Sequence, residues 1–169
     1  MTVNVEIADS VLRTAAGEGM DAFVEAVVNA IKDAVGGELN AETMQQLNAD
    51  QITLWGYHMF REEVMEGGFL QLIYIGLGDF IFMNPFAKAM REWGLKDFGK
   101  LVYEGRALYE KYHDELCREF TEEEYNALCE QYPEFDDLDD KFVSEEENYT
   151  EAVARYVDEH LEKFVTVKG

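Results

Sequence analysis

Residues 50–75 read DQITLWGYHMFREEVMEGGFLQLIYI, and they give the strongest indication of the fold class. As far as Glu66 it has apolar side chains on more than one side of a helical repeat, which is typical of a helix at the centre of a protein. Gly67 and Gly68 interrupt that helix. Residues 69–75 predict a second, short buried helix, although their aromatic and β-branched side chains would also suit a strand.

The sequence on both sides of this stretch has a helical period. An apolar stripe runs from Phe23 to Val35 and stops at a pair of glycines, and similar stripes cover residues 98–116 and 149–164. No pair of strands with hairpin chemistry is found. We therefore expect an all-α fold, a single multi-helix domain of about seven to nine helices.

Capping residues suggest where several helices begin. Asn40 suits the N-cap of a short helix, and Thr121 with Glu124 has the spacing of a capping box. Asn84 followed by Pro85 is typical of an N-cap with proline at the first helical position. The expected domain spans residues 1–169, with the helices of residues 1–47 packed on the remainder.

The composition narrows the choice of partners. The chain has 36 Asp and Glu against 14 Lys and Arg, a net charge of −22 at pH 7, in 169 residues. A direct nucleic-acid binder needs a basic patch that displaces counterions from phosphates, so no nucleic-acid binding is expected. An aromatic content of 13% separates the chain from acidic disordered proteins. No signal peptide and no membrane-spanning segment are recognised, which predicts a cytoplasmic protein without membrane contact.

The negative charge is concentrated near the C-terminal end. Residues 110–163 hold 20 acidic and 5 basic residues. We expect acidic residues 122–124 in the first turn of a helix, residues 136–140 in a connection, and residues 145–147 at the start of the last helix. Carboxylates four residues apart on a helix are separated by about 6 Å. This is similar in scale to the phosphate spacing of about 3.4 Å per strand in DNA. The alternative to a binding surface is an ordinary helix face exposed to solvent, which would show the same charge pattern.

Catalytic and metal sites are not expected. Glu110 and His113 form one ExxH unit, whereas di-iron bundles use two. The aspartates between residues 136 and 140 lack the spacing of a calcium loop, and no glycine-rich phosphate loop is present. We predict no catalytic residue, no metal ligand and no cofactor, and therefore no enzyme.

Two motifs resemble a known family. Residues 66–71, EGGFLQ, followed by Gly78, resemble the GGF core of a bacterial domain-of-unknown-function family, and residues 138–142, LDDKF, resemble its LDD-x-F element. The resemblance covers residues 48–164. Glu66 stands where the family usually has Asn, and Leu72-Ile73 replaces an aromatic pair.

The resemblance implies an all-α fold, and the family includes a double-stranded-DNA mimic protein. For a chain like that relative, the resemblance implies a dimeric, acidic protein that occupies the DNA-binding face of a transcription factor. The hypothesis is therefore an acidic interaction module that mimics DNA and binds a basic DNA-binding protein, with a homodimer as an associated expectation. The alternative is an immunity-type protein for a basic partner such as a toxin, and an enzyme is a distant third.

Within this hypothesis, the acidic surface carries the binding. Gln71 and Asp140 are expected to serve the structure instead, by satisfying backbone groups near the Gly67-Gly68 turn. The predicted partner-binding residues are Glu122, Glu123, Asp136, Asp137, Asp139, Glu145, Glu146, Glu147, Glu151 and Glu162.

Overall fold

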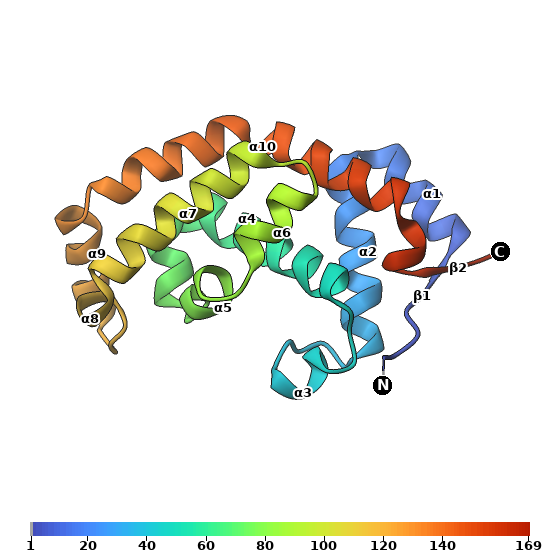
Figure 1. The fold of residues 1–169 in the computed structure, drawn as a ribbon, viewed down its shortest axis with the longest axis horizontal. Helices are drawn as coiled ribbons and strands as arrows, with labels where there is room; N and C mark the ends of the chain where they lie inside the picture. The colour runs from blue at the N-terminus through green and yellow to red at the C-terminus, as the bar shows by residue number, and fades with distance from the viewer. Residues whose placement is uncertain (1) are drawn as a thin grey trace. The chain divides into compact units, whose positions relative to one another are not determined.

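A computed structural model describes residues 2–169, and it is built almost entirely from helices (Figure 1). The helices are α1 (Asp9–Glu18), α2 (Met20–Ala34), α3 (Ala41–Met44), α4 (Ala49–Tyr74), α5 (Gly78–Phe82), α6 (Phe86–Glu92), α7 (Lys96–Lys111), α8 (His113–Leu116), α9 (Glu122–Gln131), α10 (Glu134–Glu159) and the 3-10 helix η1 (Leu161–Lys163). Strands β1 (Glu6–Ala8) and β2 (Thr166–Lys168) form a small parallel sheet. The all-α prediction is confirmed, and the described residues form ten α-helices where about seven to nine were expected.

The chain divides into two compact units. The first holds Met1–His58 and Glu147–Gly169, and the second holds Met59–Glu146. Helices α4 and α10 each contribute residues to both units. The expectation of a single domain over residues 1–169 stays a prediction.

The first unit is closed by contacts between the two ends of the chain. Its core includes the predicted face of α2, where Phe23, Val27 and Ile31 are buried. The side-chain amide of Gln51 donates a hydrogen bond to the carbonyl of Phe164 at 2.8 Å. This contact holds the segment after α10 against the start of α4.

The second unit is organised around aromatic rings. Phe60 makes edge-to-face contacts with Phe69, Phe98 and Phe142 at centroid distances of 5.3, 5.1 and 5.1 Å. All four rings are fully buried. Edge-to-face pairs of this kind add to the free energy gained from burial alone.

The glycine pair makes the predicted turn inside α4. Gly68 has φ 78° and ψ −173°, a conformation that side-chain-bearing residues rarely adopt, and the helix resumes after it. Residues 69–74 are helical, so the alternative of a strand is wrong. The predicted caps at Asn40 and Thr121 are confirmed, and both are full capping boxes.

Two predicted helix starts are wrong. Pro85 is the N-cap of α6, and the Asn84 side chain instead donates back to the carbonyl of Phe80 at 3.1 Å. Residues 136–140 form no connection, because α10 runs unbroken from Glu134. Residues 145–147 consequently lie in the middle of that helix. The physical reason is that residues 134–159 contain neither glycine nor proline, so nothing ends the helix.

Candidate acidic interface

The first part of the acidic surface is the start of α9. Thr121 accepts a hydrogen bond from the backbone N–H of Glu124, and the Glu124 carboxylate accepts one from the Thr121 N–H, both at 3.2 Å. The backbone bond from Thr121 and the ion pair with Arg118 lower the pKa of Glu124. This cap leaves Glu122 and Glu123 exposed in the first turn, where the helix dipole favours negative charge.

The second part is the beginning of α10, also in the second unit. Phe135, Leu138 and Phe142 are buried along one side of the helix. Asp136 and Asp137 are exposed. Each of these two predicted surface residues therefore presents a carboxylate to solvent.

The third part lies in the first unit, on the second half of α10 and just beyond it. Glu147 and Glu162 are exposed. Glu151 is partly exposed and pairs with Arg155 at 2.8 Å. Val153 and Val157 are buried on the other side of the helix.

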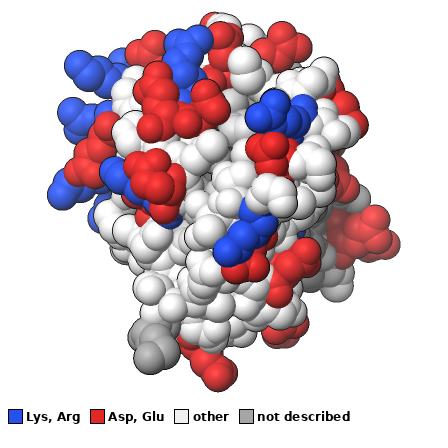
Figure 2. Space-filling model, turned by 90° about the vertical axis from the view of Figure 1, so that its right-hand side faces the viewer, with Lys and Arg blue, Asp and Glu red and all other residues white. Residues whose placement is uncertain are grey.

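The predicted surface set leaves out further exposed acids of α9 and α10. Asp140 and Asp158 are both exposed. Within the second unit, Asp140 lies four residues after Asp136 on α10, so the two share a helix face. Within the first unit, Glu147, Glu151 and Asp158 have spacings of four and seven residues, and the sequence already shows this pattern. Figure 2 shows one side of the molecule, where Asp and Glu are scattered widely and are interspersed with Lys and Arg.

Asp139, a predicted surface residue, is only partly exposed, and its carboxylate makes a contact within the fold. Its Oδ1 accepts a hydrogen bond from the backbone N–H of Phe69 at 2.8 Å. Burial raises the pKa of Asp139 to about 6, with the negative charges of Asp136 and Asp140 adding to the shift and the bond from Phe69 opposing it. Asp140 was expected to satisfy a backbone group near the Gly67-Gly68 turn, and Asp139 does so instead.

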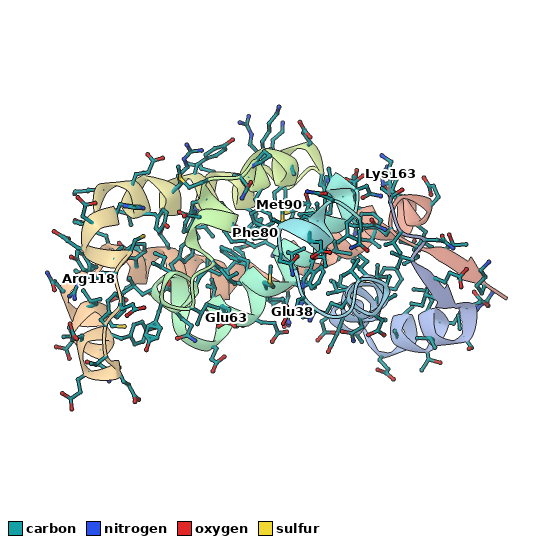
Figure 3. The ribbon with its side chains drawn as sticks, turned by 90° about the horizontal axis from the view of Figure 1, so that it is seen from below. Glu38, Glu63, Phe80, Met90, Arg118 and Lys163 are labelled. Carbon is teal, nitrogen blue, oxygen red and sulfur yellow. The ribbon has the colours of Figure 1, made fainter. Side chains whose placement is uncertain are left out.

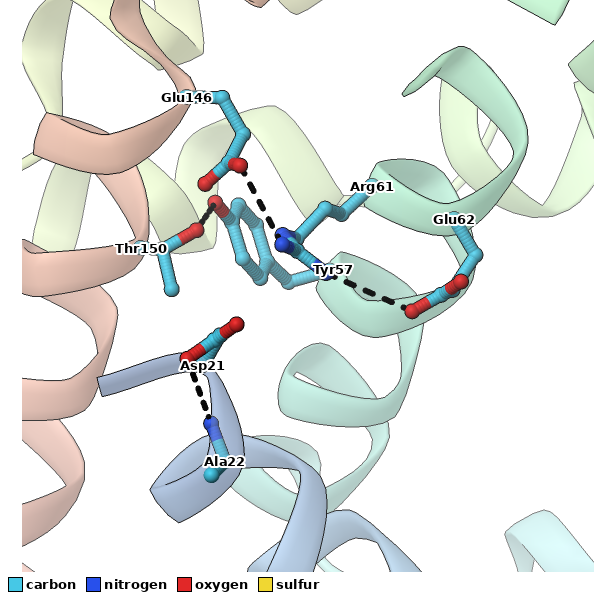
Figure 4. Close-up of polar contacts among 7 residues, drawn as sticks. All are labelled: Asp21, Ala22, Tyr57, Arg61, Glu62, Glu146 and Thr150. Atoms are coloured by element: carbon cyan, nitrogen blue, oxygen red, sulfur yellow. Dashed lines mark hydrogen bonds and ion pairs between the residues drawn. The ribbon is translucent and has the colours of Figure 1, made fainter. Parts of the chain in front are cut away.

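Glu146 is also an interior residue, because it points toward α4 rather than toward solvent. It is 8% exposed, and its Oε1 lies 3.2 Å from a guanidinium nitrogen of Arg61 (Figure 4). Glu145, beside it, is partly buried. Gln71 accepts a hydrogen bond from the Tyr125 hydroxyl at 3.3 Å and donates one to Glu63 at 3.3 Å, so its amide links side chains.

The chemistry of this surface is that of a hydrogen-bond acceptor. Ionised carboxylates accept hydrogen bonds and attract cations, and arginine can bind them in a two-pronged geometry.

Among residues 2–169, no group of three or more His, Cys, Asp or Glu side chains is placed to hold a metal ion. Within the same range, none of the helices combines the length and the apolar character that crossing a membrane requires.

Comparison with known proteins agrees with the resemblance noted from the motifs. Residues 45–160 match the DMP19-like protein family. The chain is 31% identical over 128 residues to the DNA mimic protein DMP19 of Neisseria meningitidis serogroup B (strain ATCC BAA-335 / MC58), a match covering 75% of this chain and 77% of that relative. The family resemblance is confirmed, and the match covers residues 45–160 where the motifs predicted 48–164. The chain belongs to the DMP19-like protein family.

Proposed function

We propose that this protein is a DNA mimic, a cytoplasmic binding protein without catalytic activity that occupies the DNA-binding face of a transcription factor or another DNA-binding protein. The observation that carries the proposal is the set of exposed carboxylates on α9 and α10. The similarity to a relative named as a DNA mimic supports it.

A DNA-binding face offers lysine and arginine side chains spaced for phosphates. Carboxylates one helical turn apart, such as Asp136 and Asp140, are separated by about 6 Å along the axis. Phosphates on one strand of DNA are about 3.4 Å apart along its axis, so a basic face can engage carboxylates on the same length scale. The strong net charge of −22 would also accelerate the encounter with a basic partner.

The test is a comparison of two variants that carry the same change in charge. The first neutralises four exposed acids of α9 and α10, namely Glu122→Gln, Glu123→Gln, Asp136→Asn and Asp137→Asn. The control neutralises four exposed acids of α1–α3 and the α2–α3 connection, namely Glu18→Gln, Glu25→Gln, Glu38→Gln and Glu42→Gln. Wild type and both variants are immobilised and used to capture proteins from a host lysate, with elution by a salt gradient.

We expect wild type and the control to retain the same DNA-binding protein, released at moderate salt and displaced by duplex DNA. The first variant should bind that purified partner about tenfold more weakly at low salt, mainly through slower association. Equal loss of affinity in both variants would show that only total charge matters and would refute the assigned surface. A basic toxin-like partner that duplex DNA fails to displace would replace mimicry with an immunity-type function. The homodimer belongs to the same proposal, and sedimentation velocity of the purified protein tests it.

A further inference from the structure

A cluster of positive charge stands out in this acidic chain. Residues 88–106, from α6 into α7, hold five basic and three acidic residues, although acids outnumber bases 36 to 14 overall. In Figure 3 the outer side of these two helices carries several nitrogen-tipped side chains, whereas Met90 lies on their inner side. The cluster lies apart in sequence from the acidic residues of α9 and α10.

Three of these cations line one hollow on the surface of the second unit. The hollow has a volume of about 540 Å³, and its lining residues are Arg91, Lys96, Asp97, Lys100, Tyr103, Glu104 and Ala107. Among residues 2–169, no carboxylate lies within ion-pair distance of Arg91, Lys96 or Lys100. Neighbouring cations that lack a carboxylate partner repel one another, and a bound anion would relieve that repulsion.

The packing of α6 against α7 positions one of the cations. Gly99 has no side chain, and a Cβ atom added there would lie 2.4 Å from Cγ of Arg91 and 3.0 Å from the carbonyl oxygen of Ala87. The aliphatic part of Arg91 therefore crosses α7 directly over Gly99. This places Arg91 on the same face of α7 as the hollow, next to residues 96 and 100.

An exposed aromatic ring completes the hollow. Tyr103 is 40% exposed, and it also lines a smaller neighbouring hollow together with Lys88 and Arg106. A partly exposed tyrosine among cations can bind a nucleotide. The base stacks on the face of the aromatic ring, and the phosphates pair with the cations. The volume lies within the usual range of about 300–1,000 Å³ for small-molecule sites.

We propose that this hollow binds a mononucleotide, with its phosphates on Arg91, Lys96 and Lys100 and its base against Tyr103. A small ligand fits better than a nucleic-acid polymer, because the net charge of −22 repels a long polyanion. Exposed charges are screened beyond about 8 Å at physiological salt, so the lining of the hollow sets the local field, and there three cations outnumber two carboxylates. Those carboxylates, of Asp97 and Glu104, can accept hydrogen bonds from ribose hydroxyls.

The experiment is isothermal titration of the full chain with ATP, with sodium triphosphate and with adenosine. The first variant is Arg91→Gln with Lys96→Gln and Lys100→Gln, and the second is Tyr103→Ala. The matched control is Arg13→Gln with Lys141→Gln and Lys163→Gln, which removes one exposed arginine and two exposed lysines elsewhere. Thermal melts of every variant establish that each one is folded.

We expect ATP to bind at least about tenfold more tightly than triphosphate or adenosine alone. The triple variant at the hollow should lose ATP binding by about tenfold or more, and Tyr103→Ala should weaken ATP but leave triphosphate unchanged. The control should bind ATP as wild type does. The proposal is overturned if wild type does not bind ATP at millimolar concentration, if triphosphate binds as tightly as ATP, or if the control loses as much affinity as the triple variant.

Discussion

The carboxylate of Asp139 accepts a hydrogen bond from the backbone N–H of Phe69, which lies 70 residues earlier in the chain, at 2.8 Å. This contact ties the beginning of α10 to the turn inside α4. It is possible because Gly68 has no side chain, since a Cβ atom there would lie 2.2 Å from Oδ2 of Asp139. The two motifs that carry the family resemblance, GGF and LDD-x-F, are thus in direct contact.

The first prediction concerns this turn. Gly68→Ala should reduce the free energy of unfolding by about 2 kcal/mol or more, because the residue would keep an unfavourable positive φ and would also clash with Asp139. Urea denaturation followed by circular dichroism measures the loss. Gly76→Ala is the control, since it shares a positive φ but has no atom within 4 Å of an added Cβ. Equal losses in the two variants would show that the contact with Asp139 adds nothing.

The second prediction concerns pH. The folded protein raises the pKa of Asp139 from 3.8 to about 6. The folded state therefore binds a proton more tightly than the unfolded chain, and the stability that this adds is lost as the pH rises from about 4 through about 6. Asp139→Asn keeps an acceptor for Phe69 and removes the ionisation. The melting temperature of wild type minus that of Asp139→Asn should increase as the pH falls from 7 to 5. A difference that stays constant over this range would contradict the assignment.

A third prediction separates structure from binding among neighbouring acids. Glu146→Ala would remove one of the carboxylates that pair with Arg61, which also contacts Glu62, and it should cost about 2 kcal/mol. Glu147→Ala changes an exposed residue and should alter stability by no more than about 0.5 kcal/mol. Urea denaturation of both variants provides the measurement. Similar stability in the two variants would mean that the Arg61–Glu146 contact contributes little to the fold.

The fourth prediction concerns salt. A net charge of −22 on 169 residues destabilises the folded state through repulsion, and added salt screens that repulsion. The melting temperature should therefore rise when sodium chloride increases from about 10 mM to about 150 mM. The variant lacking the charges of Glu122, Glu123, Asp136 and Asp137 should show a smaller rise. A melting temperature independent of salt in wild type would contradict the prediction.

Local sequence signals predicted much of the helical structure. The apolar spacing on α2, the capping boxes of Asn40 and Thr121, and the break at Gly68 all depend on residues close together in the chain, and all are confirmed. The parallel pairing of β1 with β2 was not foreseen, because its partners, such as Glu6 and Thr166, are far apart in sequence. A strand of three residues offers too short a pattern to recognise.

The candidate surface was harder to predict, because a carboxylate looks the same in sequence whether it faces solvent or the interior. Tertiary contacts bury Glu146 and partly bury Asp139: Glu146 contacts Arg61, and Asp139 contacts the backbone of Phe69. Neither partner lies within 60 residues of its acid in the chain. Periodicity along α10 alone could separate its faces only once the helix was known to continue from Glu134 to Glu159.

The division of the chain has a consequence for its synthesis on the ribosome. The unit formed by Met1–His58 also includes Glu147–Gly169, which are translated after the continuous segment Met59–Glu146. The second unit can therefore acquire its aromatic core while translation continues, and the first unit must wait until residues 147–169 have emerged. Until then Val5 and Ile7, which are buried beside β2 in the finished fold, lack their last strand partner. Residues 1–58 are therefore made before the second unit but complete their fold after it.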